Sequence, residues 1–206
     1  MKHIILSFLL LGLFSSAHAD FIINTGPGPG GNPGGWSLSS SQYLAAKFIV
    51  KEKTTLKSIE GWMDTAGDPG TQIGTIALYG NTMADIPGME LFSTAFKVEG
   101  DSDASWQGID GLGWMVDIGV YWAAFEVREN QTLEASMPFP AEEPLSGSGN
   151  FYAFFNTGNG MWRGGSQNFG IRIHSGDAVI PIPAAVWLFG SAMLGLVGWS
   201  HRKAKA

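Results

Sequence analysis

The sequence predicts an all-β sandwich for the central part of the chain, and three observations carry this prediction. Seven short apolar segments of strand length lie between residues 42 and 173. Clusters such as Asp68-Pro69-Gly70 and Gly158-Asn159-Gly160 separate them, and these residue types form turns. Residues 36–176 contain no apolar pattern with the 3.6-residue period of a helix. Seven or eight short strands separated by turns are typical of antiparallel sandwiches.

The expected strands are residues 42–50, 56–63, 74–79, 90–98, 120–127, 150–155 and 169–173. Residues 42–50 end at a lysine-rich turn, and the later segments end at turns that contain Gly, Asp or Asn. Apolar and polar residues alternate imperfectly in 90–98, which indicates either burial on both faces or a shifted register. Residues 24–35 are rich in Gly and Pro without periodicity, so we expect a flexible or extended leader before the sandwich.

The N-terminus has the three parts of a secretory signal peptide. A basic start at Lys2 precedes the apolar run of residues 4–14, and the small-residue pair Ala17 and Ala19 follows. We expect signal peptidase to cut after Ala19 and the rest of the chain to be exported. A buried N-terminal helix or an uncleaved anchor is the alternative, but the run is short for a membrane span of about 20 residues.

The C-terminus has a second apolar run that is long enough to cross a membrane. Residues 179–200 carry no charge, and these 22 residues would span about 33 Å as a helix. The basic residues Arg202, Lys203 and Lys205 follow the run as a stop-transfer cluster. The positive-inside rule places this tail in the cytoplasm and the sandwich on the periplasmic side of the inner membrane. A terminal helix buried in the domain is the alternative.

The C-terminal residues carry a resemblance to a known family. The motif Ile180-Pro181-Ile182-Pro183-Ala184, the apolar run and the basic tail closely resemble the VPLPA-class sorting signal of the PEP-CTERM family, with isoleucines in the aliphatic positions. The resemblance covers about the last 28 residues. It implies recognition and processing by an exosortase in Gram-negative bacteria that make exopolysaccharide, followed by display at the cell surface or in the extracellular matrix.

The central part more weakly resembles the jelly-roll-like β-sandwich domains that precede such tails, through residues 35–48, 58–62, 75–80 and 119–127. This resemblance implies a fold and no activity. The expected layout is a signal peptide at 1–19, a leader at 20–35, a sandwich at 36–176 and a sorting signal at 177–206.

The exported part is acidic and contains no cysteine. All 18 Asp and Glu lie between residues 20 and 177, against eight of the 12 Lys and Arg, which gives this part a formal charge of −10. Such a charge excludes nucleic acid as a main partner. The absence of cysteine excludes disulfides, thiolate metal sites and a cysteine nucleophile.

The residues predict no catalytic site. His174 is the only histidine between the signal peptide and the tail, and no Gly-x-Ser-x-Gly motif accompanies it. Glu60, Glu126 and Glu134 lie in or beside expected strands, but their spacing selects no pair for glycoside hydrolysis. We therefore expect a non-enzymatic domain without a cofactor, with a glycoside hydrolase as the less favoured alternative.

Two binding hypotheses remain open. Asp101 and Asp103 form a weak Ca²⁺ candidate, because their loop lacks the EF-hand spacing. Trp106, Trp114 and Trp162 lie near Gly-rich segments where an exposed ring could stack on a sugar of an exopolysaccharide, whereas Trp62 and Trp122 are expected in the core. Packing of these tryptophans within the domain is the default interpretation, and carbohydrate binding is the alternative function.

Overall fold

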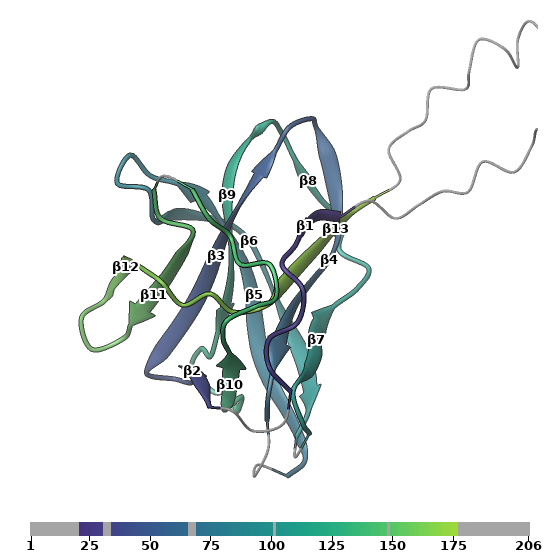
Figure 1. Ribbon diagram of the computed structural model, residues 1–206, viewed down its shortest axis with the longest axis vertical. Helices are drawn as coiled ribbons and strands as arrows, with labels where there is room; N and C mark the ends of the chain where they lie inside the picture. Colours follow the sequence, from purple (N-terminus) through teal and green to yellow (C-terminus); the bar gives the residue numbers. More distant parts are fainter. Residues whose placement is uncertain (1–20, 31–33, 66–68, 101, 148, 177–206) are drawn as a thin grey trace, which may run out of the picture. The chain divides into compact units, whose positions relative to one another are not determined.

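Every regular element in the described part of the chain is a β-strand, and every strand pairing is antiparallel. This computed structural model describes residues 21–30, 34–65, 69–100, 102–147 and 149–176, all within one compact unit, His18–Gly176. Figure 1 shows the strands gathered into two main sheets. The all-β class predicted from the sequence is confirmed.

The first main sheet has five strands. Its order is β1–β13–β4–β7, and β8 also pairs with β4. The strands are β1 (Phe21–Asn24), β4 (Thr54–Met63), β7 (Ser105–Ile109), β8 (Trp114–Val116) and β13 (Ile171–Ser175). Because Phe21 is opposite His174 in the β1–β13 pair, the first and last described strands lie side by side.

The second main sheet has six strands in the order β12–β11–β3–β9–β5–β6. The strands are β3 (Gln42–Val50), β5 (Thr71–Asn81), β6 (Pro87–Glu99), β9 (Gly119–Glu126), β11 (Tyr152–Asn156) and β12 (Met161–Gly165). A short ribbon of β2 (Gly35–Leu38) and β10 (Ala135–Pro138) lies apart from it. Two backbone hydrogen bonds of 2.8 Å between Asp64 and Ser136 connect this ribbon to the end of β4.

The hydrophobic core lies between the two main sheets. Successive side chains of a strand point to opposite faces, so one face of each sheet supplies the core. Leu44 and Phe48 of β3 and Phe125 of β9 meet Ile59 of β4 and Ile171 of β13, and all five are at most 3% exposed. Two antiparallel sheets packed over one core form a sandwich-like fold.

Tertiary pairing adds strands that the sequence pattern did not predict. Strand β3 has the predicted bounds, and the other six predicted segments coincide with β4, β5, β6, β9, β11 and β13 to within a few residues. Strands β1, β2, β7, β8, β10 and β12 were not predicted. These six have three to five residues each, too few to show an apolar period. Except for β12, which forms a hairpin with β11, they pair with strands that lie far away in the sequence.

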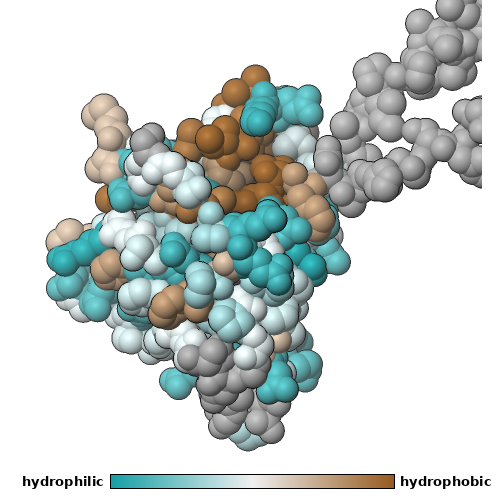
Figure 2. Space-filling view, viewed as in Figure 1, coloured by the Kyte–Doolittle hydropathy of each residue, from teal (hydrophilic) through white to brown (hydrophobic). Residues whose placement is uncertain are grey.

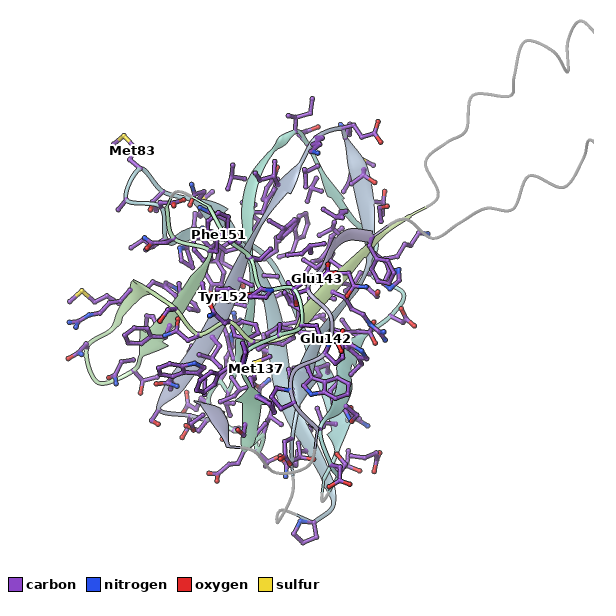
Figure 3. All side chains as sticks on the ribbon, in the orientation of Figure 1. Met83, Met137, Glu142, Glu143, Phe151 and Tyr152 are labelled. Atoms are coloured by element: carbon purple, nitrogen blue, oxygen red, sulfur yellow. The ribbon has the colours of Figure 1, made fainter. Side chains whose placement is uncertain are left out.

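The predicted leader is part of the folded domain over residues 21–29, which corrects its expected separation from the sandwich. Phe21–Asn24 forms an edge strand, and buried Thr25 exchanges hydrogen bonds with the backbone of Ile171. The backbone N–H groups of Glu142 and Glu143, labelled in Figure 3, donate to Pro27 and Thr25. The Gly and Pro residues therefore follow a path fixed by tertiary hydrogen bonds, although they show no periodicity of their own.

No helix in the described ranges is long and apolar enough to cross a membrane. The predicted signal peptide, with Ala17 and Ala19, and the predicted sorting signal at 177–206 lie outside the described residues.

Candidate functional site

The three tryptophans considered for carbohydrate binding lie in three different places, so they do not form one binding site. All three lie on strands and are partly buried. Trp106 belongs to β7 in the five-stranded sheet, and Trp162 belongs to β12 at an edge of the six-stranded sheet. Trp114 of β8 stacks on Phe92 of β6, with ring centroids 5.5 Å apart, and packs against the core.

Trp106 is engaged by its neighbours on the outer face of the five-stranded sheet. It is opposite Trp62 on β4, and the two rings meet edge to face with centroids 5.5 Å apart. The guanidinium carbon of Arg172 lies 4.5 Å from the Trp106 ring, and Arg172 donates to both oxygens of Glu60 at 2.6 and 2.7 Å. Trp62 is therefore on the outer face, and the expectation that it belongs to the core is wrong.

The outer face of the six-stranded sheet carries a continuous row of aromatic rings. We name Tyr43, Phe155, Trp162 and Tyr79 the aromatic row. Tyr43 and Phe155 are stacked at 5.4 Å, Phe155 and Trp162 are 5.4 Å apart, and Trp162 meets Tyr79 at 5.7 Å between centroids. All four rings are partly buried, so each keeps some accessible surface.

The contact between Trp162 and Tyr79 requires the six-stranded sheet to curl. Their strands, β12 and β5, are separated by three others, which on a flat sheet would place them about 19 Å apart. The face that curls inward is lined by methyl groups, because Ala45, Ala77, Ala124 and Ala153 are fully buried there together with Trp122. Trp122 is thus buried as expected, but in this second cluster and not between the two sheets.

A charged cluster borders the aromatic row. The Glu126 side chain is 2% exposed and accepts hydrogen bonds from the Tyr79 hydroxyl at 2.6 Å and from Arg128 Nε at 2.7 Å. Arg128 also donates to Glu90 at 2.7 Å. Burial and the hydrogen bond to Glu126 raise the pKa of Tyr79, so its hydroxyl stays protonated and donates.

The row and the cluster belong to one site, because Tyr79 is a ring of the row and its hydroxyl donates to Glu126. Burial, followed by the negative charge of Glu126, raises the pKa of Tyr43, the first ring of the row. Lys47, which is opposite Trp122 on the neighbouring strand, donates to both oxygens of Asp85 at 2.9 and 2.7 Å. Its ammonium nitrogen lies 4.6 Å from the centre of the Phe151 ring. Rings beside fixed donors and acceptors form a surface suited to sugars, which offer flat C–H faces and hydroxyl edges.

The acidic residues considered for catalysis do not converge. Glu60 pairs with Arg172 in the five-stranded sheet, Glu126 lies in the six-stranded sheet, and Glu134 is exposed beside β10. His174 lies against Phe21, with ring centroids 3.9 Å apart. None of these side chains is brought next to another by the fold.

Glu126 instead meets Glu90, which the sequence analysis missed because 36 residues separate the two and no motif connects them. Both carboxylates contact Arg128 and the Tyr79 hydroxyl. Burial acts to raise the pKa of Glu90, but hydrogen bonds from Ser93 and Arg128 lower it below its usual value. Glu90 is therefore ionised at neutral pH and does not have the proton that a general acid needs.

Within the described residues, no cluster of acidic side chains forms around the calcium candidate Asp103. Asp103 is exposed, and Asp101 lies outside the described residues. Among the residues that the structure describes, no group of three or more His, Asp or Glu side chains is arranged to hold a metal ion. The sorting motif Ile180–Ala184 and the basic residues Arg202, Lys203 and Lys205 also lie outside those residues.

Comparison of the chain with protein-family models, with curated proteins and with solved structures finds no significant match. The class that the fold and site define is thus a sandwich-like all-β domain with an aromatic and charged outer face.

Proposed function

We propose that this chain is an exported, non-catalytic surface protein whose domain binds polysaccharide. Its signal peptide directs export, and an exosortase processes it near Pro181–Ala184. Residues 184–199, the part of the apolar run that follows the proline motif, tether it to inner-membrane lipid. Processing displays the domain at the cell surface or releases it into the exopolysaccharide matrix. This part of the proposal rests on the agreement of the proline motif, the apolar run and the basic residues that follow it.

The sorting proposal is tested by mass spectrometry of the protein from cells with and without an exosortase. In cells that contain the enzyme, the mature chain is expected to begin at Asp20 and to lack the peptide after Pro183. Recovery of Lys205 on the mature chain from those cells contradicts processing. A matched control is Pro181→Ala with Pro183→Ala, which we expect to keep the tail attached in both strains.

We further propose that the sandwich is a jelly roll. Strands β1, β3, β4, β5, β6, β7, β9 and β13 form the eight-stranded frame. We number these eight strands 1 to 8 in chain order. One sheet then has the strand order 1-8-3-6, and the other has the strand order 2-7-4-5. This order is that of a sandwich built from two Greek keys. The β11–β12 hairpin extends the second sheet beyond β3 and supplies Trp162 and Phe155.

The aromatic row carries the carbohydrate-binding part of the proposal. Four neighbouring rings provide a partly accessible apolar surface, and the adjoining side chains Glu90 and Arg128 are 37% and 35% exposed. A sugar that stacks on the rings can place its hydroxyls against those charged groups. The net acidic domain favours neutral glycans over strongly anionic ones.

A glycan array with the full chain in detergent tests this binding. We expect binding to oligosaccharides that is reduced in Trp162→Ala and retained in Trp106→Ala, because only Trp162 belongs to the row. The less favoured hydrolase predicts release of reducing ends from the bound glycan, with loss of that release in Glu126→Gln. Binding without release supports the non-catalytic proposal, and release that depends on Glu126 overturns it.

A further inference from the structure

One end of the sandwich carries exposed apolar side chains beside the point where the described chain ends. We name this surface the exit end, and its apolar residues are Phe21, Ile49, Met115, Ile118 and Val120. They account for five of the eleven exposed large apolar side chains among the described residues. Ile118 is 72% and Ile49 is 56% exposed, so neither is needed for the core. Figure 2 shows apolar surface gathered at the top of the molecule in this view.

Strand register brings these side chains together. Ile49 at the end of β3 is opposite Val120 at the start of β9. The β3–β4 and β8–β9 turns lie next to each other, because Lys53 forms a 3.1 Å ion pair with Asp117. Met115 is opposite Thr55, whose carbonyl accepts a hydrogen bond from the backbone of Gly176. The apolar tips, the start of β1 and the end of β13 therefore share one end of the domain.

A shallow pocket of about 230 Å³ opens on this end. Phe21, Ile22, Ile49 and Val50 form its apolar walls, and Lys51 and Glu52 lie at its polar edge. Thr54 and Ser175 complete its lining, which is therefore half apolar and half polar. A hollow next to protruding apolar side chains provides more contact surface than isolated exposed residues do.

The exit end carries a small excess of basic side chains on an otherwise acidic domain. Lys51, Lys53 and Lys57 are exposed there, against Glu52 and Asp117, and Lys53 is paired with Asp117. The exported part as a whole has a charge of −10. Lysines around apolar tips are typical of surfaces that contact anionic phospholipids, because the ammonium groups meet the headgroups while the apolar tips enter the interface.

The tether of the proposed function limits how far this end can move from the bilayer. Its membrane span, residues 184–199, begins eight residues after Gly176. An extended chain covers at most about 3.6 Å per residue, so eight residues reach at most about 29 Å. If this segment spans the membrane, the exit end is the part of the domain to which the tether is attached.

We propose that the exit end docks on the phospholipid surface of the membrane, with Ile49, Ile118 and Val120 in the interface and the three lysines against anionic headgroups. The proposal rests on the membrane tether of the proposed function. Docking fixes the orientation of the domain before processing, with β1 and β13 next to the bilayer and the sorting motif at its surface. A second copy of the chain is the competing occupant of the same surface.

The absence of cysteine in the chain allows a direct test with one introduced thiol. The full chain carrying Ile118→Cys is labelled with an environment-sensitive fluorophore and reconstituted into vesicles of equal parts phosphatidylcholine and phosphatidylglycerol. The matched control is Ser40→Cys, an exposed position before β3, which lies about 25–30 Å from Ile49 along the strand. Docking predicts that aqueous iodide quenches the label at 118 at least about threefold less than the label at 40.

Further variants separate docking from tethering. Adding Ile49→Ser and Val120→Ser to Ile118→Cys is expected to restore the access of iodide to the label. Replacing phosphatidylglycerol with phosphatidylcholine is expected to restore this access in part. If iodide quenches the labels at 118 and 40 equally while alkali fails to extract the chain from the vesicles, docking is overturned and the tether is supported. A chain that alkali extracts from the vesicles overturns the tether itself. In the unlabelled Ile118→Cys chain, oxidation that gives disulfide-linked dimers in a yield that does not fall as the protein is diluted in the vesicles overturns lipid docking in favour of a second copy.

Discussion

Trp162 lies edge-on against Tyr79, with ring centroids 5.7 Å apart, although three strands separate β12 from β5 in the sheet. This contact closes the curl of the six-stranded sheet and completes the aromatic row. It also covers a floor of buried alanines that includes Ala45 and Ala124. The same two rings thus stabilise the curled sheet and form part of the proposed binding surface.

The alanine floor predicts a strong penalty for added volume. Ala124→Val inserts two methyl groups beneath Trp122 and Trp162, where Ala124 is fully buried, and we expect a loss of about 1–3 kcal/mol in the free energy of unfolding. Ala95→Val is the control, because Ala95 is exposed on the edge strand β6 and valine favours strands. Urea denaturation measures the free energy of unfolding of both variants. Equal stability of the two variants would contradict a tightly closed floor.

The buried carboxylate of Glu126 predicts a stability cost when its charge is removed. Glu126→Gln places an amide donor against Tyr79 or Arg128, which both donate to this residue. We expect the free energy of unfolding to fall by about 2 kcal/mol, since Arg128 keeps Glu90 as a partner. Asp117→Asn removes an ion pair whose partners are 62% and 77% exposed, and it should cost at most about 0.5 kcal/mol. A smaller cost at Glu126 than at Asp117 would refute the buried cluster.

The Lys47–Asp85 ion pair predicts a specific acid sensitivity. Burial acts to raise the pKa of Asp85, but hydrogen bonds from Lys47 and Asn150 hold it below its ordinary value of 3.8. The unfolded chain therefore takes up the proton first, so the contribution of Asp85 is complete above its unfolded pKa and is lost as the pH falls through the native pKa. The difference in unfolding free energy between wild type and Asp85→Asn should shrink from about pH 5 to about pH 2. A difference that is independent of pH would show that the charge of Asp85 contributes nothing.

Residues 26–28 pack against Gly170, so a substitution at this distant glycine should disturb them. A Cβ at Gly170 would lie 2.8 Å from the Gly26 carbonyl oxygen and 3.3 Å from the Gly28 nitrogen. Gly170→Ala should therefore displace residues 26–28 and destabilise the domain by about 1–3 kcal/mol. Gly113→Ala has open space around it and should be neutral or slightly stabilising. Hydrogen exchange at Thr25 locates the effect, and unchanged protection there in Gly170→Ala would contradict the packing of this stretch.

The parts of the fold that local patterns predict are the long strands. Residues 42–50 were predicted with their observed bounds, because nine mostly apolar residues end at a lysine-rich turn. Met161–Gly165 looked like a loop, because two of its five residues are glycines, and only pairing with β11 makes it a strand. Residues 25–29 gave no local indication either, since the hydrogen bonds that hold them on the sandwich come from partners more than 30 residues away, such as Ile171, Glu142 and Trp62.

The candidate site was predictable only in fragments. Trp162 was singled out because of its Gly-rich surroundings, and Glu126 because it is an acidic residue in an expected strand. Their partners Tyr79 and Glu90 come from β5 and β6, and no spacing in the sequence connects them. Trp106, chosen on the same grounds as Trp162, lies in the other sheet. Sheet order, which residue spacing does not encode, decides which of these side chains meet.

The central claim is that the aromatic row binds polysaccharide, and affinity electrophoresis tests it most directly. The full chain in detergent is run in native gels that contain purified exopolysaccharide, with gels lacking the polymer as reference. We expect retardation of the wild type and of Trp106→Ala, and a Kd about tenfold weaker for Trp162→Ala. Circular dichroism confirms that each variant is folded. Equal retardation of Trp162→Ala and wild type, or no retardation of wild type, would contradict the claim.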